Sequence, residues 1–119
     1  MATVELTKDN FVETVNDNDI VVVDFWASWC PPCRQFGPIF ERASDRNGDV
    51  LFGKVNTEEQ RELQAAYEIA SIPTTLFIRD SVLVHQQVGV MNGDQLDKML
   101  NQLRGLDMAE IHAAAEKPA

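Results

Sequence analysis

The sequence predicts an α/β fold in which helices cover both faces of a sheet. One observation is the run from Ile20 to Phe25, which is apolar except for Asp24 and is typical of a strand buried on both faces. A second is the helical spacing of apolar residues that follows it directly, at Phe36, Ile39, Phe40 and Ala43. A third is the alternation of strand-like and helix-like segments along the first half of the chain.

The first half is expected to run strand, helix, strand, helix, strand. Residues 4–6 form a short first strand, and Thr7 is the expected N-cap of a helix that buries Phe11, Val12 and Val15. The helix after the central strand ends near Asn47-Gly48. Residues 50–55 form the third strand, and a helix then begins around Thr57 with its apolar face at Leu63, Ala66, Tyr67 and Ala70.

The second half is expected to form a hairpin and a final helix. Strands at 74–79 and 82–88 are separated only by Asp80-Ser81, a spacing that suits an antiparallel pair. Simple alternation in the second strand places Val82, Val84 and Val88 on one face and Leu83, His85 and Gln87 on the other. His85 receives no functional role. A helix with Leu96, Met99, Leu100 and Leu103 then ends at Gly105.

The length of 119 residues favours one domain, which we place at residues 1–105. Residues 106–119 form a C-terminal extension. Asp107 and Glu110 have capping-box spacing, so part of this extension is expected to be helical, with a frayed Glu-Lys-Pro-Ala end.

Composition excludes several classes of partner. Ten basic and nineteen acidic residues give a net charge of −9, which opposes nucleic-acid binding. The longest apolar run, Ile20 to Val23, is far too short to cross a membrane, and the N-terminal residues do not resemble an export signal. We therefore expect a cytoplasmic monomer whose partners are proteins.

The only two cysteines, Cys30 and Cys33, lie at the junction between the central strand and the long helix. A helix N-terminus stabilises a thiolate, so Cys30 is the candidate nucleophile. Cys33 lies almost one turn later, within reach of Cys30 and more covered by the helix, and is the candidate resolving thiol. The pair suits thiol–disulfide exchange through a mixed disulfide.

Three other interpretations of the pair remain open at this point. A zinc site normally needs four ligands, and His85 and His112 lack paired spacing, so we predict no metal. A structural disulfide would close a very small loop and remove little chain entropy. Two inert thiols would leave the position of the pair at the junction unexplained.

The segment VDFWASWCPPC, residues 23–33, resembles the active site of the thioredoxin family. The resemblance extends to Pro38, Lys54, Ile72-Pro73-Thr74 and Val88-Gly89, and covers nearly the whole chain to Gly105. It implies a thioredoxin fold, with a central mixed five-stranded sheet of strand order 1-3-2-4-5 flanked by four helices. It also implies a protein-disulfide reductase that binds no cofactor, takes its electrons from NADPH through a thioredoxin reductase, and acts on disulfide-containing proteins.

The resemblance assigns further residues. Asp24 is implied to lie beneath Cys33 as its proton acceptor, with a pKa raised by burial, and Lys54 to tune it electrostatically. The Ile72–Pro73 bond is expected to be cis and to face the cysteines, leaving the Ile72 backbone free to pair with a substrate strand. The implied docking patch consists of Trp29, Pro32, Ile72, Pro73, Val88 and Gly89. Trp26 and Pro38 are expected to be structural, with Pro38 kinking the long helix.

The sequence departs from the family pattern at three places. Pro31 stands where glycine is usual, which removes a backbone N–H and predicts a less stabilised Cys30 thiolate and a more reducing pair. Glu68 and Asp80-Ser81 replace glycines that are common in turns.

Two alternative functions remain. The first is a thiol oxidase, an isomerase or a dedicated reductase of an exported pathway. The second is a binding or chaperone subunit whose cysteines are dispensable. The reduction potential distinguishes the first alternative, and the phenotype of a double serine variant distinguishes the second.

Overall fold

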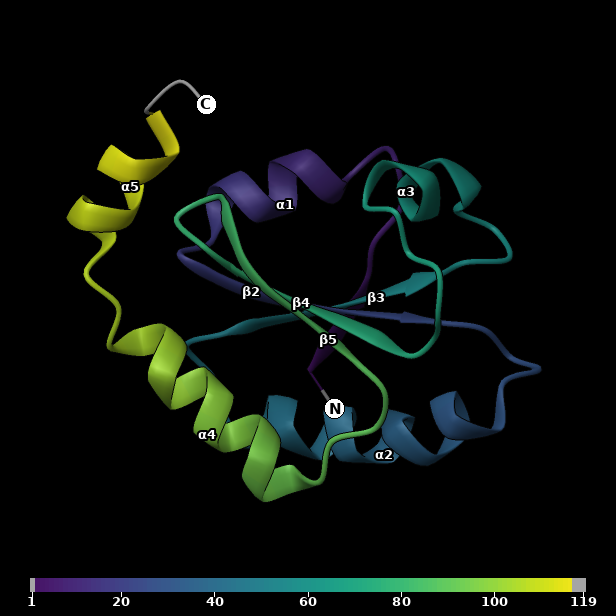
Figure 1. Ribbon diagram of the computed structural model, residues 1–119. Helices are drawn as coiled ribbons and strands as arrows, with labels where there is room; N and C mark the ends of the chain where they lie inside the picture. The colour runs from purple at the N-terminus through teal and green to yellow at the C-terminus, as the bar shows by residue number, and fades with distance from the viewer. Residues whose placement is uncertain (1, 117–119) are drawn as a thin grey trace.

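The computed structural model describes residues 2–116 and consists of a five-stranded sheet with helices around it (Figure 1). The strands are β1 (Thr3–Glu5), β2 (Ile20–Trp26), β3 (Leu51–Asn56), β4 (Thr74–Arg79) and β5 (Val82–Val88). The helices are α1 (Phe11–Asp17), α2 (Pro31–Arg46), α3 (Arg61–Ala66), α4 (Gly93–Arg104) and α5 (Met108–Glu116).

The sheet has the order β1-β3-β2-β4-β5. β1, β3 and β2 are parallel, whereas β4 is antiparallel to β2 and β5 is antiparallel to β4. The expected mixed sheet and its strand order are therefore confirmed. β2 lies at the centre of the sheet, as its apolar sequence predicts, and it ends four residues before Cys30.

Figure 1 shows α1 and α3 on one face of the sheet and α2 and α4 on the other. Two apolar clusters fill the layers. Because side chains alternate along a strand, Val21, Val23 and Phe25 of β2 join the cluster under α1 and α3. The other face of β2 presents Ile20, Val22 and, in the same alternation, Asp24. The cluster under α2 and α4 includes Ile20, Val22, Phe36, Phe40, Ala43, Phe52, Phe77, Leu96, Leu100 and Leu103.

Two helices on the α1/α3 face differ from the prediction. α1 begins at Phe11 with Asn10 as its N-cap, because residues 7–10 form a turn in which the Asn10 side chain accepts from the Thr7 N–H. Val12 is 68% exposed, so it lies outside the core. α3 begins only at Arg61 and ends at Ala66, with Leu63 as its buried residue, and the expected core positions Ala66 and Ala70 are exposed.

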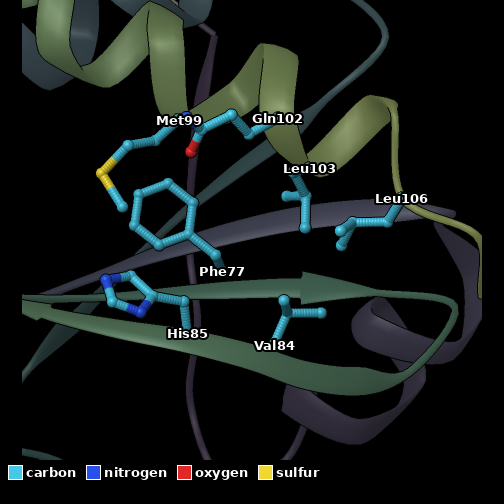
Figure 2. A pocket seen from close by; sticks show the side chains of 7 residues that line it. All are labelled: Phe77, Val84, His85, Met99, Gln102, Leu103 and Leu106. Atoms are coloured by element: carbon cyan, nitrogen blue, oxygen red, sulfur yellow. The ribbon is translucent and has the colours of Figure 1, made fainter. Parts of the chain in front are cut away.

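A β-bulge overturns the alternation expected for β5. Leu83 is opposite Ile78 and His85 is opposite Phe77, so Val84 is an extra residue between these pairs. Figure 2 shows that Val84 and His85 consequently point to the same side, toward Phe77 and α4, where they line a pocket with Met99, Gln102, Leu103 and Leu106. Val88 is 61% exposed and falls on the opposite face from Val84.

The C-terminal extension forms α5, as expected. The Glu110 N–H donates to the Asp107 carboxylate at the start of this helix, and Met108 is buried. His112 lies 3.5 Å from the Asp80 carboxylate in the β4–β5 turn. Of the end expected to be frayed, residues 117–119 lie outside the described residues.

Among residues 2–116, three turn residues other than glycine adopt positive φ. These are Glu68 after α3, with φ +53°, and Asp80 and Ser81 in the hairpin, with φ +50° and +65°. They include the positions where glycine is common in the family, so the left-handed backbone persists there without glycine.

Candidate active site

The cysteine pair lies where β2 ends and α2 begins. Cys30 is the N-cap of α2, and the Cys33 N–H donates to its Sγ at 3.2 Å. Pro31 and Pro32 occupy the first two helical positions and have no N–H, so Cys33 is the first residue of α2 that can donate. Cys30 and Cys33 are joined in a disulfide with their Cα atoms 5.2 Å apart.

Both cysteines are largely covered in this disulfide form. Cys30 is 3% exposed and Cys33 is 4% exposed, so the greater cover expected for Cys33 is not seen in the disulfide form. The cover comes partly from Ala27, Trp26 and Ile72, which pack with the pair in a small cluster.

The segment before β4 faces the pair. The Ile72–Pro73 peptide bond is cis, as the resemblance implies, and the Ile72 carbonyl oxygen lies 3.7 Å from Cys30 Sγ. The Gly89 N–H donates to the Pro73 carbonyl at 2.8 Å, with Gly89 at φ +96°. These contacts bring residues 72–73 and 88–89 beside the cysteines.

Only some residues of the expected docking patch are exposed to solvent. Trp29 is 65% exposed and Val88 is 61% exposed, and Pro32 is also exposed. Ile72 and Gly89 are half-buried, whereas Pro73 is buried and contributes mainly through its backbone. The exposure of Trp29 shows that it is not a core aromatic residue.

Asp24 is fully buried in the middle of β2. It shares a sheet face with Val22, which packs under α2, the helix that carries Cys33. Neither carboxyl oxygen has a hydrogen-bond partner among residues 2–116, and neither does the neighbouring buried Thr75 hydroxyl. Burial raises the pKa of Asp24 from 3.8 to about 7, while the charge of Lys54 lowers it.

Lys54 is directly opposite Asp24 in the register between β2 and β3. Its ammonium nevertheless pairs with Glu41 of α2, with 3.6 Å between Nζ and Oε1, and lies 5.2 Å from the centre of the Trp26 ring. The charge of Glu41 raises the pKa of Asp24. Sequence reasoning placed Lys54 near Asp24 but missed Glu41, because nothing in the sequence pairs Glu41 with Lys54.

Glu58 is a second residue that sequence reasoning missed. It accepts from the Ser28 N–H at 3.0 Å and the Ser28 hydroxyl at 2.8 Å, which ties the loop before Cys30 to the segment after β3. These hydrogen bonds lower the pKa of Glu58. Beside this contact runs a groove lined by Trp29, Thr57, Glu58, Arg61, Gln64, Ala70 and Ile72.

The residues expected to be structural lie beside the site rather than in it. Pro38 is inside α2, which continues through it, and its side chain is exposed. Trp26 is half-buried between Lys54 and the cysteine cluster. The pocket in Figure 2 lies between α4 and the hairpin and includes neither cysteine.

Residues 2–116 contain no group of three or more histidine, cysteine or acidic side chains placed to hold a metal ion. No helix among these residues combines the length and apolar character needed to cross a membrane.

Comparison with known proteins agrees with this geometry. The family model described as Thioredoxin matches residues 2–102. The chain belongs to the thioredoxin family. A Streptomyces coelicolor protein named "Putative thioredoxin 2" is 50% identical over 119 residues, covering 99% of this chain and 89% of that one. A thioredoxin of Chlorobaculum thiosulfatiphilum is 39% identical over 82% of this chain and 93% of its own length.

The solved structures confirm the fold. A mutant thioredoxin from Halobacterium salinarum superposes with a TM-score of 0.81 at 28% identity, covering 87% of this chain and 92% of that one. Together with the Cys30–Cys33 pair, this membership makes the chain a thiol–disulfide oxidoreductase with protein-disulfide reductase activity.

Proposed function

We propose that this thioredoxin-family protein reduces disulfides of target proteins in the cytoplasm, with Cys30 as nucleophile and Cys33 as resolving thiol. The observation that carries the assignment is the N-cap position of Cys30, whose Sγ accepts the Cys33 N–H. That donor and the positive end of α2 stabilise negative charge on the first sulfur.

The reaction proceeds in two exchanges. The Cys30 thiolate attacks one sulfur of the substrate disulfide, forms a mixed disulfide and displaces the other substrate sulfur as a thiolate, which takes a proton from water. Cys33 then gives its proton to Asp24, attacks Cys30 Sγ and displaces the second substrate thiolate. The substrate gains two electrons, and the protein is left with the Cys30–Cys33 disulfide.

Asp24 is suited to accept the proton in the second exchange. Its pKa of about 7 means that both protonation states are available at neutral pH. A buried carboxyl without a hydrogen-bond partner destabilises the fold, which supports a functional reason for its presence. Lys54 tunes this group through its charge.

The exposed ring of Trp29 and the apolar surface of Pro32 and Val88 form the docking surface for the substrate. Within residues 2–116 the Ile72 N–H has no acceptor, so an extended substrate strand is free to pair with the backbone at Ile72. The hydrogen bond from the Gly89 N–H to the Pro73 carbonyl holds this segment in place.

The proposal also covers the domain bounds, the oligomeric state and the source of electrons. The protein is a monomer with a thioredoxin domain at residues 1–105 and an extension at 106–119. It binds no cofactor, and a thioredoxin reductase that draws on NADPH restores the dithiol.

The experiment that tests the roles of the two cysteines is a trapping assay with a disulfide-bonded protein substrate. We expect Cys33→Ser to accumulate a mixed disulfide through Cys30, visible by mass spectrometry and released by dithiothreitol, because no thiol remains to resolve it. We expect Cys30→Ser to form no such adduct and to lose reductase activity. A stable adduct through Cys33 in the Cys30→Ser variant, with none in Cys33→Ser, would reverse the two roles.

A further inference from the structure

A carboxylate in the third turn of α2, outside the cysteine motif, contacts two strands of the sheet. Glu41 Oε1 lies 3.6 Å from Lys54 Nζ, and both side chains are largely covered, with 18% and 24% of their surface exposed. The Thr3 hydroxyl of β1 is within hydrogen-bond distance of both Glu41 oxygens, at 2.8 and 3.0 Å. The Glu41 carboxylate therefore accepts a hydrogen bond from Thr3 of β1 and forms an ion pair with Lys54 of β3.

Lys54 has three acidic residues around it, Asp24 of β2, Glu5 of β1 and Glu41 of α2, and its ammonium pairs with Glu41. The strand register places its Cα opposite that of Asp24. Its ammonium instead lies at Glu41 and over the Trp26 ring, and the Asp24 oxygens have no hydrogen-bond partner among the described residues. The contacts of Glu41 thus account for the direction in which Lys54 extends.

We propose that Glu41 is a positioning residue for proton transfer at the active site: it holds the Lys54 ammonium away from the Asp24 carboxyl, so that Asp24 still takes up and releases a proton at neutral pH. The proposal rests on the proposed role of Asp24 as proton acceptor for Cys33. Glu41 itself touches neither substrate nor cysteine in this role and acts through Lys54.

The electrostatics of the surroundings agree with this arrangement. The charged groups that act on Asp24 are Lys54 from β3, which lowers its pKa, and Glu41 from α2, which raises it. β4 contributes the uncharged Thr75 at the paired position. β1 contributes the Thr3 hydroxyl that holds Glu41 and the exposed Glu5, which is opposite Lys54 in the strand register. The Cys30–Cys33 pair at the start of α2 carries no charge in the disulfide form.

Replacing Glu41 by glutamine should lower the pKa of Asp24. Glu41→Gln removes a negative charge that raises the pKa of Asp24, and it also frees the Lys54 ammonium to approach Asp24. Both changes favour the ionised carboxylate. Glutamine keeps the length of the side chain and an oxygen that can accept from Thr3, so the packing of α2 on the sheet is retained.

The test measures the titration of Asp24 directly, through the chemical shift of its carboxyl carbon in NMR spectra of the oxidised protein, in which the cysteines do not titrate. We expect Glu41→Gln to move the Asp24 midpoint to lower pH by about one unit. Lys54→Met should move it to higher pH. Glu13→Gln is the matched control, because it removes the same charge from an exposed position in α1, on the other face of the sheet, and should leave the midpoint unchanged.

The double variant Glu41→Gln, Lys54→Met tests whether Glu41 acts through Lys54. In the Lys54→Met background we expect Glu41→Gln to produce less than half of the shift that it produces alone. A Glu41→Gln midpoint equal to or above that of the unmodified protein would overturn the proposal. An undiminished shift in the Lys54→Met background would also overturn it, because Glu41 would then act by its own charge alone.

The kinetic consequence is read from the resolution of a preformed mixed disulfide across a range of pH. In Glu41→Gln the acidic limb of the rate profile should move to lower pH in step with the Asp24 midpoint. Asp24→Asn should remove that limb. If Asp24→Asn left the profile intact, the proposed role of Asp24 would fail, whereas an unmoved Asp24 midpoint in Glu41→Gln would refute the positioning role of Glu41 alone.

Discussion

Two prolines limit the number of donors that the Cys30 sulfur receives. The N-terminus of a helix normally offers several free N–H groups, but Pro31 and Pro32 have none, and the Cys33 N–H is the one that reaches Cys30 Sγ. A thiolate at this position is consequently stabilised by fewer hydrogen bonds than the same sulfur would have beside glycine.

Pro31→Gly should increase the fraction of Cys30 present as thiolate at a given pH, because it adds a backbone donor at the helix N-terminus. The ultraviolet absorbance of the thiolate in the reduced protein, followed against pH, measures this change. Pro38→Ala is the control, since it also removes a proline from α2 but lies about two turns from the sulfur. A smaller thiolate fraction in Pro31→Gly would contradict the account.

At the residue scale, the positions of the candidate site residues were predictable where a motif carries the information, and their roles stay predictions. Cys30, Cys33 and Asp24 stand in one continuous segment, and Asp24 is conspicuous as the polar residue in an apolar strand. Glu41 and Glu58 were missed because their partners, Lys54 and Ser28, are brought to them only by the fold. Neither glutamate differs in its local sequence from an ordinary surface residue.

At the scale of elements, long periodic segments were predictable and short ones were not. The apolar run of β2 and the amphipathic pattern of α2 identify their elements and most of their buried residues. α3 has only six residues, too few for periodicity to fix its start, and the bulge at Val84 reverses the faces of the second half of β5. The bulge arises from the pairing of β5 with β4, and the alternation of residues within β5 alone contains no information about that pairing.

The turn after α3 yields a prediction about stability. Glu68 adopts φ +53°, a conformation that costs a residue with a side chain more than it costs glycine. We expect Glu68→Gly to raise the free energy of unfolding by roughly 0.5–1 kcal/mol, in spite of the greater chain entropy of glycine.

Chemical denaturation at fixed pH and redox state measures this difference. Ala65→Gly, in the exposed part of α3, is the matched control and should lower the free energy of unfolding by about 1 kcal/mol. If both variants were destabilised equally, the positive φ of Glu68 would not be a source of strain.

At the scale of the whole molecule, the buried carboxyl makes stability depend on pH. The pKa of Asp24 is about 7 in the folded protein, against 3.8 for an ordinary exposed aspartate. Below the lower value both states are protonated, and the folded state carries no penalty for this group. Between the two values the unfolded state loses its proton while the folded state keeps it, so the free energy of unfolding falls as pH rises. Above the folded value the fold must accommodate a buried carboxylate, and the stability contributed by the protonated form is lost in full.

Asp24→Asn should therefore stabilise the oxidised protein most at alkaline pH. The shift from 3.8 to about 7 corresponds to a gain in the free energy of unfolding of at most about 4 kcal/mol above pH ~8. Below pH ~4 the substitution should have little effect on the free energy of unfolding. Denaturation curves across this range measure the difference. The same change at the exposed Asp9 should show no comparable pH dependence. A constant Asp24→Asn effect at all pH values would contradict the raised pKa.

The central claim is that the Cys30–Cys33 couple works as a reductant of protein disulfides. The most direct test is the equilibrium reduction potential of the couple, measured at neutral pH against a glutathione or dithiothreitol buffer. We expect a value near about −270 mV, the range of reducing thioredoxins. A value near about −120 mV would mean that the protein donates its disulfide to other proteins, and would contradict the proposed direction of electron flow.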